Sequence, residues 1–360
     1  MQVAPFFCMT LAVTRLVSGG LVATYQCQSH CPHCLYRSGP GREPAYIDQD
    51  TAAAAFAKAV ELGAGSMHVG GGEPLVDPLG LAGVLAAAAE TGMTIEYVET
   101  SGSWFDDRDE AVELLTELKG MGLSTLLVSI SPMHNGFIPL RKTLGTIEAA
   151  RAAGVTVFPW QEHFLDDLRA FDPDVVHPFR EYLERFGPDY PAEILRRTWI
   201  RLGGRSFEFF APVLGRLPAP RILAEASADC LAELTDTSHF HMDLYGDYVP
   251  GLCPGLAMRV SDLGAPLDPE RYPILSTLAV EGIRGLYDYA ANLEGYEPRP
   301  EGYVNKCELC QDMQFEAAQV EPIGGVGNKK RLPARVGEPL PEPLAPGCED
   351  VSIRNGDHDG

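Results

Sequence analysis

Apolar and polar positions alternate along this chain in a regular rhythm from about residue 21 to residue 160. Short apolar runs are expected to form β-strands at residues 21–25, 66–69, 94–100, 124–131 and 155–160. Longer segments with helical periodicity are expected at residues 51–62, 79–89, 106–121 and 140–153. Asp50 is the expected N-cap of the first helix, and a glycine closes each helix. Strands that alternate with such helices predict βαβ units and a parallel sheet.

The regular alternation ends after residue 160. Helices are expected around residues 179–186 and 192–198, followed by a last strand of the sheet near residues 199–202. Residues 243–248 have the character of a hairpin turn. After about residue 321 the chain is rich in proline, glycine and charge, as in a tail with little fixed structure.

Composition excludes several classes of function. The 360 residues include 28 basic and 50 acidic side chains, and the formal charge of −22 argues against binding to nucleic acids or to an anionic membrane surface. No apolar run has the length of a membrane span, and no signal peptide is present. We therefore expect a cytoplasmic protein, and its nine cysteines indicate metal ligation rather than disulfides, with Cys8 and Cys348 outside the expected ligand sets.

Three of these cysteines lie within eight residues, in the run CQSHCPHC: Cys27, Cys31 and Cys34. Short gaps let neighbouring thiolates converge on one iron–sulfur cluster. Three ligands on four irons leave one iron open, where a small molecule can bind. A zinc knuckle is the competing interpretation, because His30 and His33 lie within the same loop. It would leave unexplained the Gly-Gly-Gly-Glu-Pro run at residues 70–74.

Cys-x3-Cys-x2-Cys followed by Gly-Gly-Glu-Pro resembles the signature of the radical S-adenosylmethionine (SAM) enzymes. The resemblance implies a partial (β/α)6-type barrel and a [4Fe-4S] cluster that is held by the three cysteines and binds SAM at its open iron. Reduction would cleave SAM to a 5′-deoxyadenosyl radical, which abstracts a hydrogen atom from the substrate. A reductant such as flavodoxin or ferredoxin is then an expected partner.

The expected SAM pocket lies at the carboxyl ends of the strands, where parallel sheets bind their ligands. Glycines at 71 and 72 let the backbone approach a ligand closely. The resemblance implies that Gly71, Gly72 and Glu73 receive the SAM amino group. It also implies that His33, the residue before the third cysteine, packs on adenine.

Two serines and an arginine pair complete the expected pocket. Ser129 and Ser131 share one face of their strand, which makes them candidate contacts of the SAM ribose or carboxylate. Arg201, or alternatively Arg205, could hold a carboxylate through two hydrogen bonds.

Four further thiols lie in the C-terminal third of the chain: Cys230, Cys253, Cys307 and Cys310. With a turn glycine before Cys253, their order resembles the twitch domain, a shortened form of the SPASM extension, although the gap from glycine to cysteine is longer than usual. The resemblance implies a second, fully ligated [4Fe-4S] auxiliary cluster. The spacing alone favours a four-cysteine zinc site or suits both sites equally. The position after a radical SAM barrel favours the cluster.

His239, His241 and Asp243 alternate along one segment between Cys230 and Cys253. Alternate residues of a strand point the same way, so these three could form a metal-binding row. We expect instead that they bind substrate or backbone within a hairpin.

These interpretations divide the chain into four regions: an N-terminal helix (1–20), a radical SAM partial barrel (21–205), a small cysteine-rich twitch/SPASM-like domain (206–320) and a flexible tail (321–360). Twitch enzymes oxidise small molecules, so the leading hypothesis is radical oxidation or rearrangement of a small polar metabolite in natural-product biosynthesis. About 20 residues before the first strand cannot hold the precursor-binding domain of many peptide-modifying relatives.

That length favours a small molecule over the cross-linking or maturation of a peptide (RiPP). Sulfur insertion that consumes the auxiliary cluster is a further alternative. A non-catalytic iron–sulfur electron carrier is the alternative from a different class, and the intact Glu73 and cysteine triad argue against it.

Overall fold

The computed structural model describes residues 11–292 and 296–320. Within them, eight strands form one sheet in the order β5-β4-β3-β2-β1-β6-β7-β8. The strands are β1 (Gly19–Thr24), β2 (Ser66–Gly71), β3 (Thr94–Thr100), β4 (Thr125–Ser129), β5 (Thr156–Trp160), β6 (Phe240–Asp243), β7 (Asp247–Val249) and β8 (Met258–Arg259). Neighbours from β5 to β6 pair in parallel, whereas β6, β7 and β8 are antiparallel.

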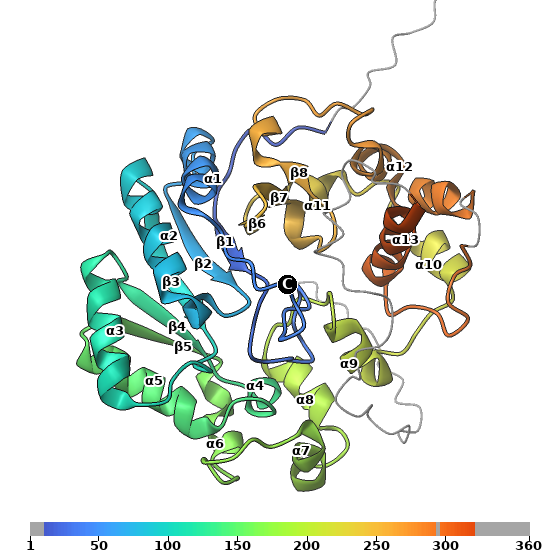
Figure 1. Cartoon of the computed structure of the whole chain (residues 1–360). Helices are drawn as coiled ribbons and strands as arrows, with labels where there is room; N and C mark the ends of the chain where they lie inside the picture. The colour runs from blue at the N-terminus through green and yellow to red at the C-terminus, as the bar shows by residue number, and fades with distance from the viewer. Residues whose placement is uncertain (1–10, 293–295, 321–360) are drawn as a thin grey trace, which may run out of the picture.

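Four helices connect the parallel strands and lie along the outer side of the sheet in Figure 1: α1 (Gln49–Glu61), α2 (Pro78–Thr91), α3 (Arg108–Gly120) and α5 (Leu140–Ala152). Each buries one apolar stripe against the sheet, for example Phe56 of α1 and Leu115 of α3, both fully buried. The predicted α/β class with an open, barrel-like parallel sheet is confirmed. The first helix is capped by Asp48 rather than Asp50, because its carboxylate accepts the Thr51 N–H at 2.8 Å.

The remaining helices follow the barrel strands or belong to the C-terminal half. They are α4 (Pro132–Asn135), α6 (Leu165–Leu168), α7 (Phe179–Phe186), α8 (Tyr190–Arg197), α9 (Ser206–Leu214), α10 (Ala219–Glu225), α11 (Leu231–Thr235), α12 (Pro273–Ala291) and α13 (Lys306–Val320). Short 3-10 turns occur at Pro74–Val76, Glu162–Phe164, Pro250–Leu252 and Val260–Asp262. Helices α10, α12 and α13 gather on the side of the molecule away from α2 and α3 (Figure 1).

The predicted last strand near residues 199–202 is wrong, because these residues form no strand. The sixth parallel strand is β6, which pairs with β1 on the side opposite β2. Burial explains the difference: the Trp199 side chain is 70% exposed, whereas Phe240 and Met242 of β6 are fully buried. The predicted hairpin follows, with Gly246 (φ 72°) in the turn between β6 and β7.

The N-terminal helix predicted for residues 1–20 is not found over residues 11–18, which run in an extended path. Leu11 and Val13 are buried and accept backbone hydrogen bonds from Leu267 and Gly264 at 2.8 and 2.9 Å. Their spacing of two residues is that of a strand-like segment rather than of a helix. Residues 1–10 and the predicted tail, 321–360, lie outside the described residues.

Across residues 11–292 and 296–320, none of the helices combines the length and the hydrophobicity that a bilayer span requires.

Candidate active site

The carboxyl ends of β1 to β4 surround a cavity with an empty volume of about 570 Å³, including the part open to solvent. Its lining consists of Cys27, Ser29, Cys31, His33, Cys34, Ser38, Gly71, Gly72, Glu99, Thr100, Ser101, Ser129, His134 and Arg205. The structure therefore brings together the three cysteines of the CQSHCPHC run. They face one space at the edge of the sheet where α/β proteins bind ligands.

The cysteine loop offers buried sulfur ligands. Burial, together with the nearby Glu73 carboxyl, raises the pKa of the Cys27 thiol to about 12, and burial raises that of Cys31 well above its ordinary value. Such thiols lose their protons only to a strongly bound metal. Backbone N–H groups of Ser29 and Ser38 donate to the sulfurs of Cys27 and Cys34 at 3.4 and 3.3 Å, a contact typical of cluster-ligating sulfur. This donor set fits an iron–sulfur cluster.

Arg205 holds this loop in place from the start of α9. Its Nε donates to the Cys31 carbonyl at 2.8 Å, Nη2 donates to the Ser38 carbonyl at 2.6 Å, and its backbone N–H donates to the Cys34 carbonyl at 3.1 Å. The side chain is only 2% exposed, and Nη1 is buried without a hydrogen-bond partner among the described residues. Of the two arginines considered from the sequence, Arg205 is therefore the one at this cavity.

The glycine run packs against the backbone that leads into the cysteine loop. A Cβ on Gly71 (φ 128°) would lie 2.4 Å from the Thr24 carbonyl oxygen, and one on Gly72 only 1.9 Å from that of Gln26. The Gly72 N–H donates to the Thr24 carbonyl at 2.7 Å. Side chains would prevent this contact, so the two glycines set the position of the loop as well as lining the cavity.

Glu73 is fully buried and holds the end of β3. Its Oε1 accepts the Thr100 hydroxyl at 2.9 Å, and Oε2 accepts the Ser101 N–H and hydroxyl at 2.8 and 2.6 Å. Burial raises the pKa of this carboxyl despite the hydrogen bonds. Glu73 does not line the cavity, so its contact with a SAM amino group stays a prediction.

The two serines predicted to share a face are separated. Ser129 ends β4 and lines the cavity, whereas Ser131 lies beyond the strand, fully buried, as the N-cap of α4. The Ser131 hydroxyl is 2.7 Å from His134 Nδ1, and the His134 ring packs edge-on against His33 with centroids 4.9 Å apart. Burial lowers the pKa of both histidines, that of His134 to about 4. A neutral His33 ring at the cavity wall is compatible with stacking on adenine.

A second cavity, with an empty volume of about 580 Å³, contains the other cysteine set. Cys230 precedes α11, Cys253 follows a 3-10 turn, and Cys307 and Cys310 lie on α13; all four line this cavity. Burial raises the pKa of Cys253 to about 12. The structure thus brings together four thiols that are as much as 80 residues apart in sequence (310 minus 230 is 80).

Arg201, predicted as a SAM or carboxylate contact, lines this second cavity and not the first. Its Nη2 donates to the Gly251 carbonyl at 3.2 Å. The Gln314 amide Nε2 donates to the Cys310 sulfur at 2.9 Å, which stabilises the negative charge of a ligating thiolate. Arg205 therefore lines the first cavity, and Arg201 lines the second.

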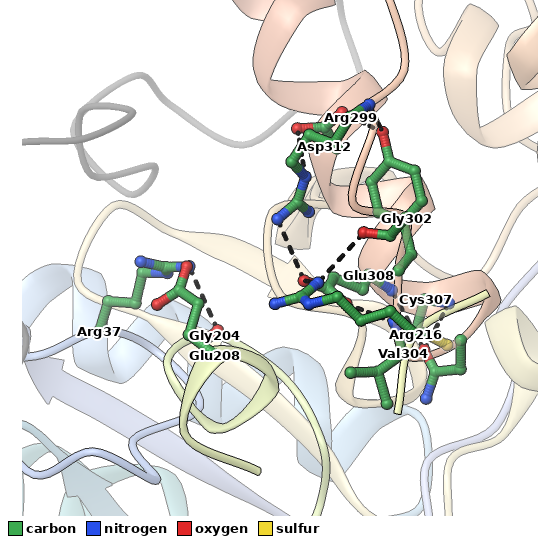
Figure 2. Close-up of polar contacts among 12 residues, drawn as sticks. Arg37, Gly204, Glu208, Arg216, Arg299, Gly302, Val304, Cys307, Glu308 and Asp312 are labelled. Atoms are coloured by element: carbon green, nitrogen blue, oxygen red, sulfur yellow. Dashed lines mark hydrogen bonds and ion pairs between the residues drawn. The ribbon is translucent and has the colours of Figure 1, made fainter. Parts of the chain in front are cut away.

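An ion-pair network fixes the start of α13. Figure 2 shows the Glu308 carboxylate between Arg216 and Arg299, at 2.7 and 3.1 Å, with the Val304 N–H donating to its second oxygen at 2.6 Å. Glu308 is nearly fully buried, and both arginines are largely covered. Cys307 is the preceding residue, so this network holds two of the four thiols at the cavity.

The segment around residues 239–243 is used in two ways. Asp243 accepts hydrogen bonds from the Tyr25 hydroxyl at 2.8 Å and from the Tyr245 N–H at 3.0 Å, so it binds the hairpin backbone as expected. His239 and His241 turn instead towards His68 of β2. The sequence does not predict a role for His68; its only sequence signal is that it lies two residues before Gly70 and so shares a face of β2 with it.

The structure thus has an open, mostly parallel sheet with a thiol-lined cavity at its strand ends, the place where α/β proteins bind ligands. Residues 21–163 match the family model of the Radical SAM superfamily. These residues therefore form a radical SAM domain, and enzymes with this domain use a [4Fe-4S] cluster and SAM. No curated protein matches the chain.

Matches among solved structures include three proteins. Native anSMEcpe with bound AdoMet is 13% identical, with a TM-score of 0.41 over 84% of this chain and 97% of that one. Streptococcus suis SuiB bound to the precursor peptide SuiA is 11% identical, with a TM-score of 0.32 over 80% and 69%. HydG, a maturase of the [FeFe]-hydrogenase, is 17% identical, with a TM-score of 0.30 over 40% and 34%.

Proposed function

We propose that this enzyme binds SAM beside a [4Fe-4S] cluster held by Cys27, Cys31 and Cys34 and oxidises or rearranges a small polar metabolite. The observation that carries the proposal is the convergence of these three thiols on one cavity at the strand ends, with Gly71 and Gly72 in its wall. When bound, the cluster and SAM supply a 5′-deoxyadenosyl radical that abstracts a hydrogen atom from the substrate.

The residues of the cavity have separate tasks in this proposal. Arg205 orients the cysteine loop by donating to the carbonyl oxygens of Cys31 and Ser38, and its Nη1, which has no partner among the described residues, can donate to a carboxylate oxygen. Ser129 and the His33 ring offer a hydroxyl and a stacking face to the ribose and adenine. Glu99 faces the same cavity; burial and the neighbouring Glu73 raise the pKa of its carboxyl to about 7, so it can exchange a proton with a substrate near neutral pH.

The residues on the inner face of the sheet favour a small substrate that has both an apolar face and polar groups. Tyr97 and Glu99 alternate on β3 and so share this face. The ring centroids of Tyr97 and Phe158 are 6.4 Å apart, and those of Phe158 and Trp160 are 5.8 Å apart. Phe158 is 43% exposed and Trp160 is 41% exposed. Exposed rings beside a carboxyl group suit a molecule that stacks on one side and is bound by polar groups on another.

The second cavity is proposed to hold an auxiliary [4Fe-4S] cluster bound by Cys230, Cys253, Cys307 and Cys310. Four thiolates close such a cluster, which suits electron transfer from a substrate radical. Anaerobically purified protein should then contain about eight irons per chain. About four irons together with bound zinc would identify the second cavity as a zinc site.

The reaction can be tested with reduced, reconstituted enzyme. Dithionite and SAM should yield 5′-deoxyadenosine. If the cluster is reduced and no 5′-deoxyadenosine forms, the proposal is overturned. Host cells grown in heavy water provide an extract of deuterated small molecules, which is filtered and added to the reaction. If the substrate is among these molecules, deuterium should appear in the 5′-deoxyadenosine. Transfer from the retained peptide fraction alone would identify peptide maturation instead. A product that has lost two hydrogens indicates oxidation, an unchanged mass indicates rearrangement, and a gain of sulfur indicates sulfur insertion.

A further inference from the structure

Three histidines from two strands meet on the inner face of the sheet, outside both cysteine-lined cavities. His68 lies on β2, His241 on β6, and His239 directly before β6. One ring nitrogen of each lies within 4.8 Å of those of the other two. His68 and His241 are buried, and His239 is half-buried. The function proposed above leaves this group without a role.

The sheet is built to let the rings meet. Strand β1 lies between β2 and β6, and Gly20 is the register partner of both His68 and His241. A Cβ on Gly20 would lie 2.1 Å from His68 Nε2. A side chain at this position would therefore occupy the space in which the two imidazoles approach each other across β1.

The spacing of the rings fits metal coordination. His68 Nε2 and His241 Nε2 are 3.3 Å apart. Two nitrogens bound to one tetrahedral zinc ion at about 2.0–2.1 Å are separated by about 3.3 Å. A ring nitrogen of His239 lies within 4.8 Å of both, and it would have to move closer to complete the set. Burial lowers the pKa of all three histidines, so they are in the neutral form that binds metal.

The outer edges of the rings are held by further contacts. His241 Nδ1 is 2.9 Å from the Tyr36 hydroxyl, and the Gly19 backbone lies beside the His68 ring. Hydrogen bonds on the second ring nitrogen orient metal-binding histidines in this way. Tyr36 lies two residues after Cys34, so the cysteine loop also contributes to the histidine group.

A carboxylate links the group to the first cavity. Glu99 Oε1 lies 4.0 Å from His68 Nε2, and Glu99 also lines the cavity that contains Cys27, Cys31 and Cys34. A metal ion at the histidines would therefore have its remaining position directed towards the space where the substrate radical forms. Three histidines with one open position are typical of catalytic rather than structural sites.

We propose that His68, His239 and His241 bind one divalent first-row transition metal ion, with Glu99 or a substrate oxygen in its remaining position. Imidazole ligands suit zinc, iron, nickel and copper. The metal would hold an oxygen atom of the substrate beside the radical cavity. This site does not depend on SAM cleavage, so its test is separate from that of the reaction.

The competing arrangement contains no metal. In it, Tyr36 donates to His241 Nδ1, and His241 Nε2–H donates to His68 Nε2 along the same 3.3 Å contact. Zinc bound by nitrogen ligands distinguishes the two arrangements. In the metal-free arrangement, the hydrogen bond between His241 and His68 uses both Nε2 atoms, so neither has a lone pair left for a metal.

Zinc is the probe for the test, since X-ray absorption at the zinc edge is not obscured by iron. Full-length protein with both cysteine sites reconstituted is equilibrated with zinc, washed and analysed for metal content and zinc ligands. We expect about one zinc per chain with imidazole nitrogen ligands in the wild type. His239→Ala should lose it, and because this side chain is half-buried the fold should persist. His163→Ala, at an exposed histidine on another segment, is the matched control and should retain it.

A second measurement tests the role of Tyr36. Competition with a chelator should show that Tyr36→Phe binds zinc about 10-fold to 100-fold more weakly than the wild type. The proposal is overturned if the wild type holds no zinc with nitrogen ligands, if all its zinc has sulfur ligands, or if His239→Ala retains the same nitrogen-bound zinc.

Discussion

The Arg205 side chain donates from Nε to the carbonyl oxygen of Cys31 at 2.8 Å, although 174 residues separate the two. Gly204, beside it, approaches the Cys34 carbonyl so closely that a Cβ would lie 2.5 Å from that oxygen, and its N–H donates to Gln311 Oε1 at 3.3 Å. Residues 203–205 therefore join the cysteine loop of the first cavity to α13, which carries two thiols of the second.

Arg205→Met should loosen the cysteine loop. It removes two charge-assisted hydrogen bonds from a buried side chain, which together stabilise the fold by about 3 kcal/mol or more. We expect a lower unfolding midpoint and slower formation of 5′-deoxyadenosine. Arg196→Met, at an exposed arginine of α8, is the matched control and should change neither. Unchanged stability of the Arg205 variant would show that the loop is held by other contacts.

Alanine at Cys27, Cys31 or Cys34 should abolish SAM cleavage, because a cluster ligand is lost. Alanine at Cys310 should lower the iron content by about four while leaving 5′-deoxyadenosine formation wholly or partly intact. Iron analysis and product chromatography on the same preparations check both outcomes. Equal loss of SAM cleavage in both classes of variant would contradict the separate roles of the two cavities.

Glu308→Ala should destabilise the start of α13. Removing the carboxylate leaves Arg216 and Arg299 without their buried partner, a change that costs about 3–5 kcal/mol. We expect loss of metal from the second cavity and retention of the cluster in the first, measured by iron content and Mössbauer spectroscopy. Glu301→Ala, at an exposed position before the same helix, is the control.

The His177 side chain should make stability depend on pH. Burial alone would lower its pKa, but hydrogen bonds with Glu181 at 2.7 Å and the Asp172 carbonyl at 2.8 Å outweigh burial and raise it above 6.5. The protonated ring therefore stabilises the fold below pH 6.5, and this contribution is lost as pH rises through the higher pKa of the folded state. Thermal unfolding midpoints should fall between about pH 6 and pH 8, and less so in His177→Gln.

Gly20→Ala should disturb the histidine group. The added methyl would lie 2.1 Å from His68 Nε2 and would displace a buried ring, at a cost of about 1–3 kcal/mol. We expect a lower unfolding midpoint together with loss of nitrogen-bound zinc. Gly120→Ala, where a Cβ meets nothing within 4 Å, is the control. Normal zinc binding by Gly20→Ala would show that the rings do not need this space.

The strands and helices up to residue 160 could be predicted because the strands are short, largely apolar runs and the helices between them carry an apolar stripe. The cysteine sets could be predicted from spacing within short loops. The positions of Ser131 and Arg201 could not be predicted, because strand ends and side-chain direction depend on tertiary packing: Ser131 caps α4, and Arg201 lines the second cavity. His68 could not be found, since its partners lie more than 170 residues away along the chain (239 minus 68 is 171).

Because β6 hydrogen-bonds to β1, the C-terminal half completes the sheet that begins the barrel. In a protein truncated after residue 205, β1 would become an exposed edge strand whose unpaired backbone could associate with other chains. The two halves are therefore interdependent in folding, and neither is expected to be obtained by itself as a well-behaved domain.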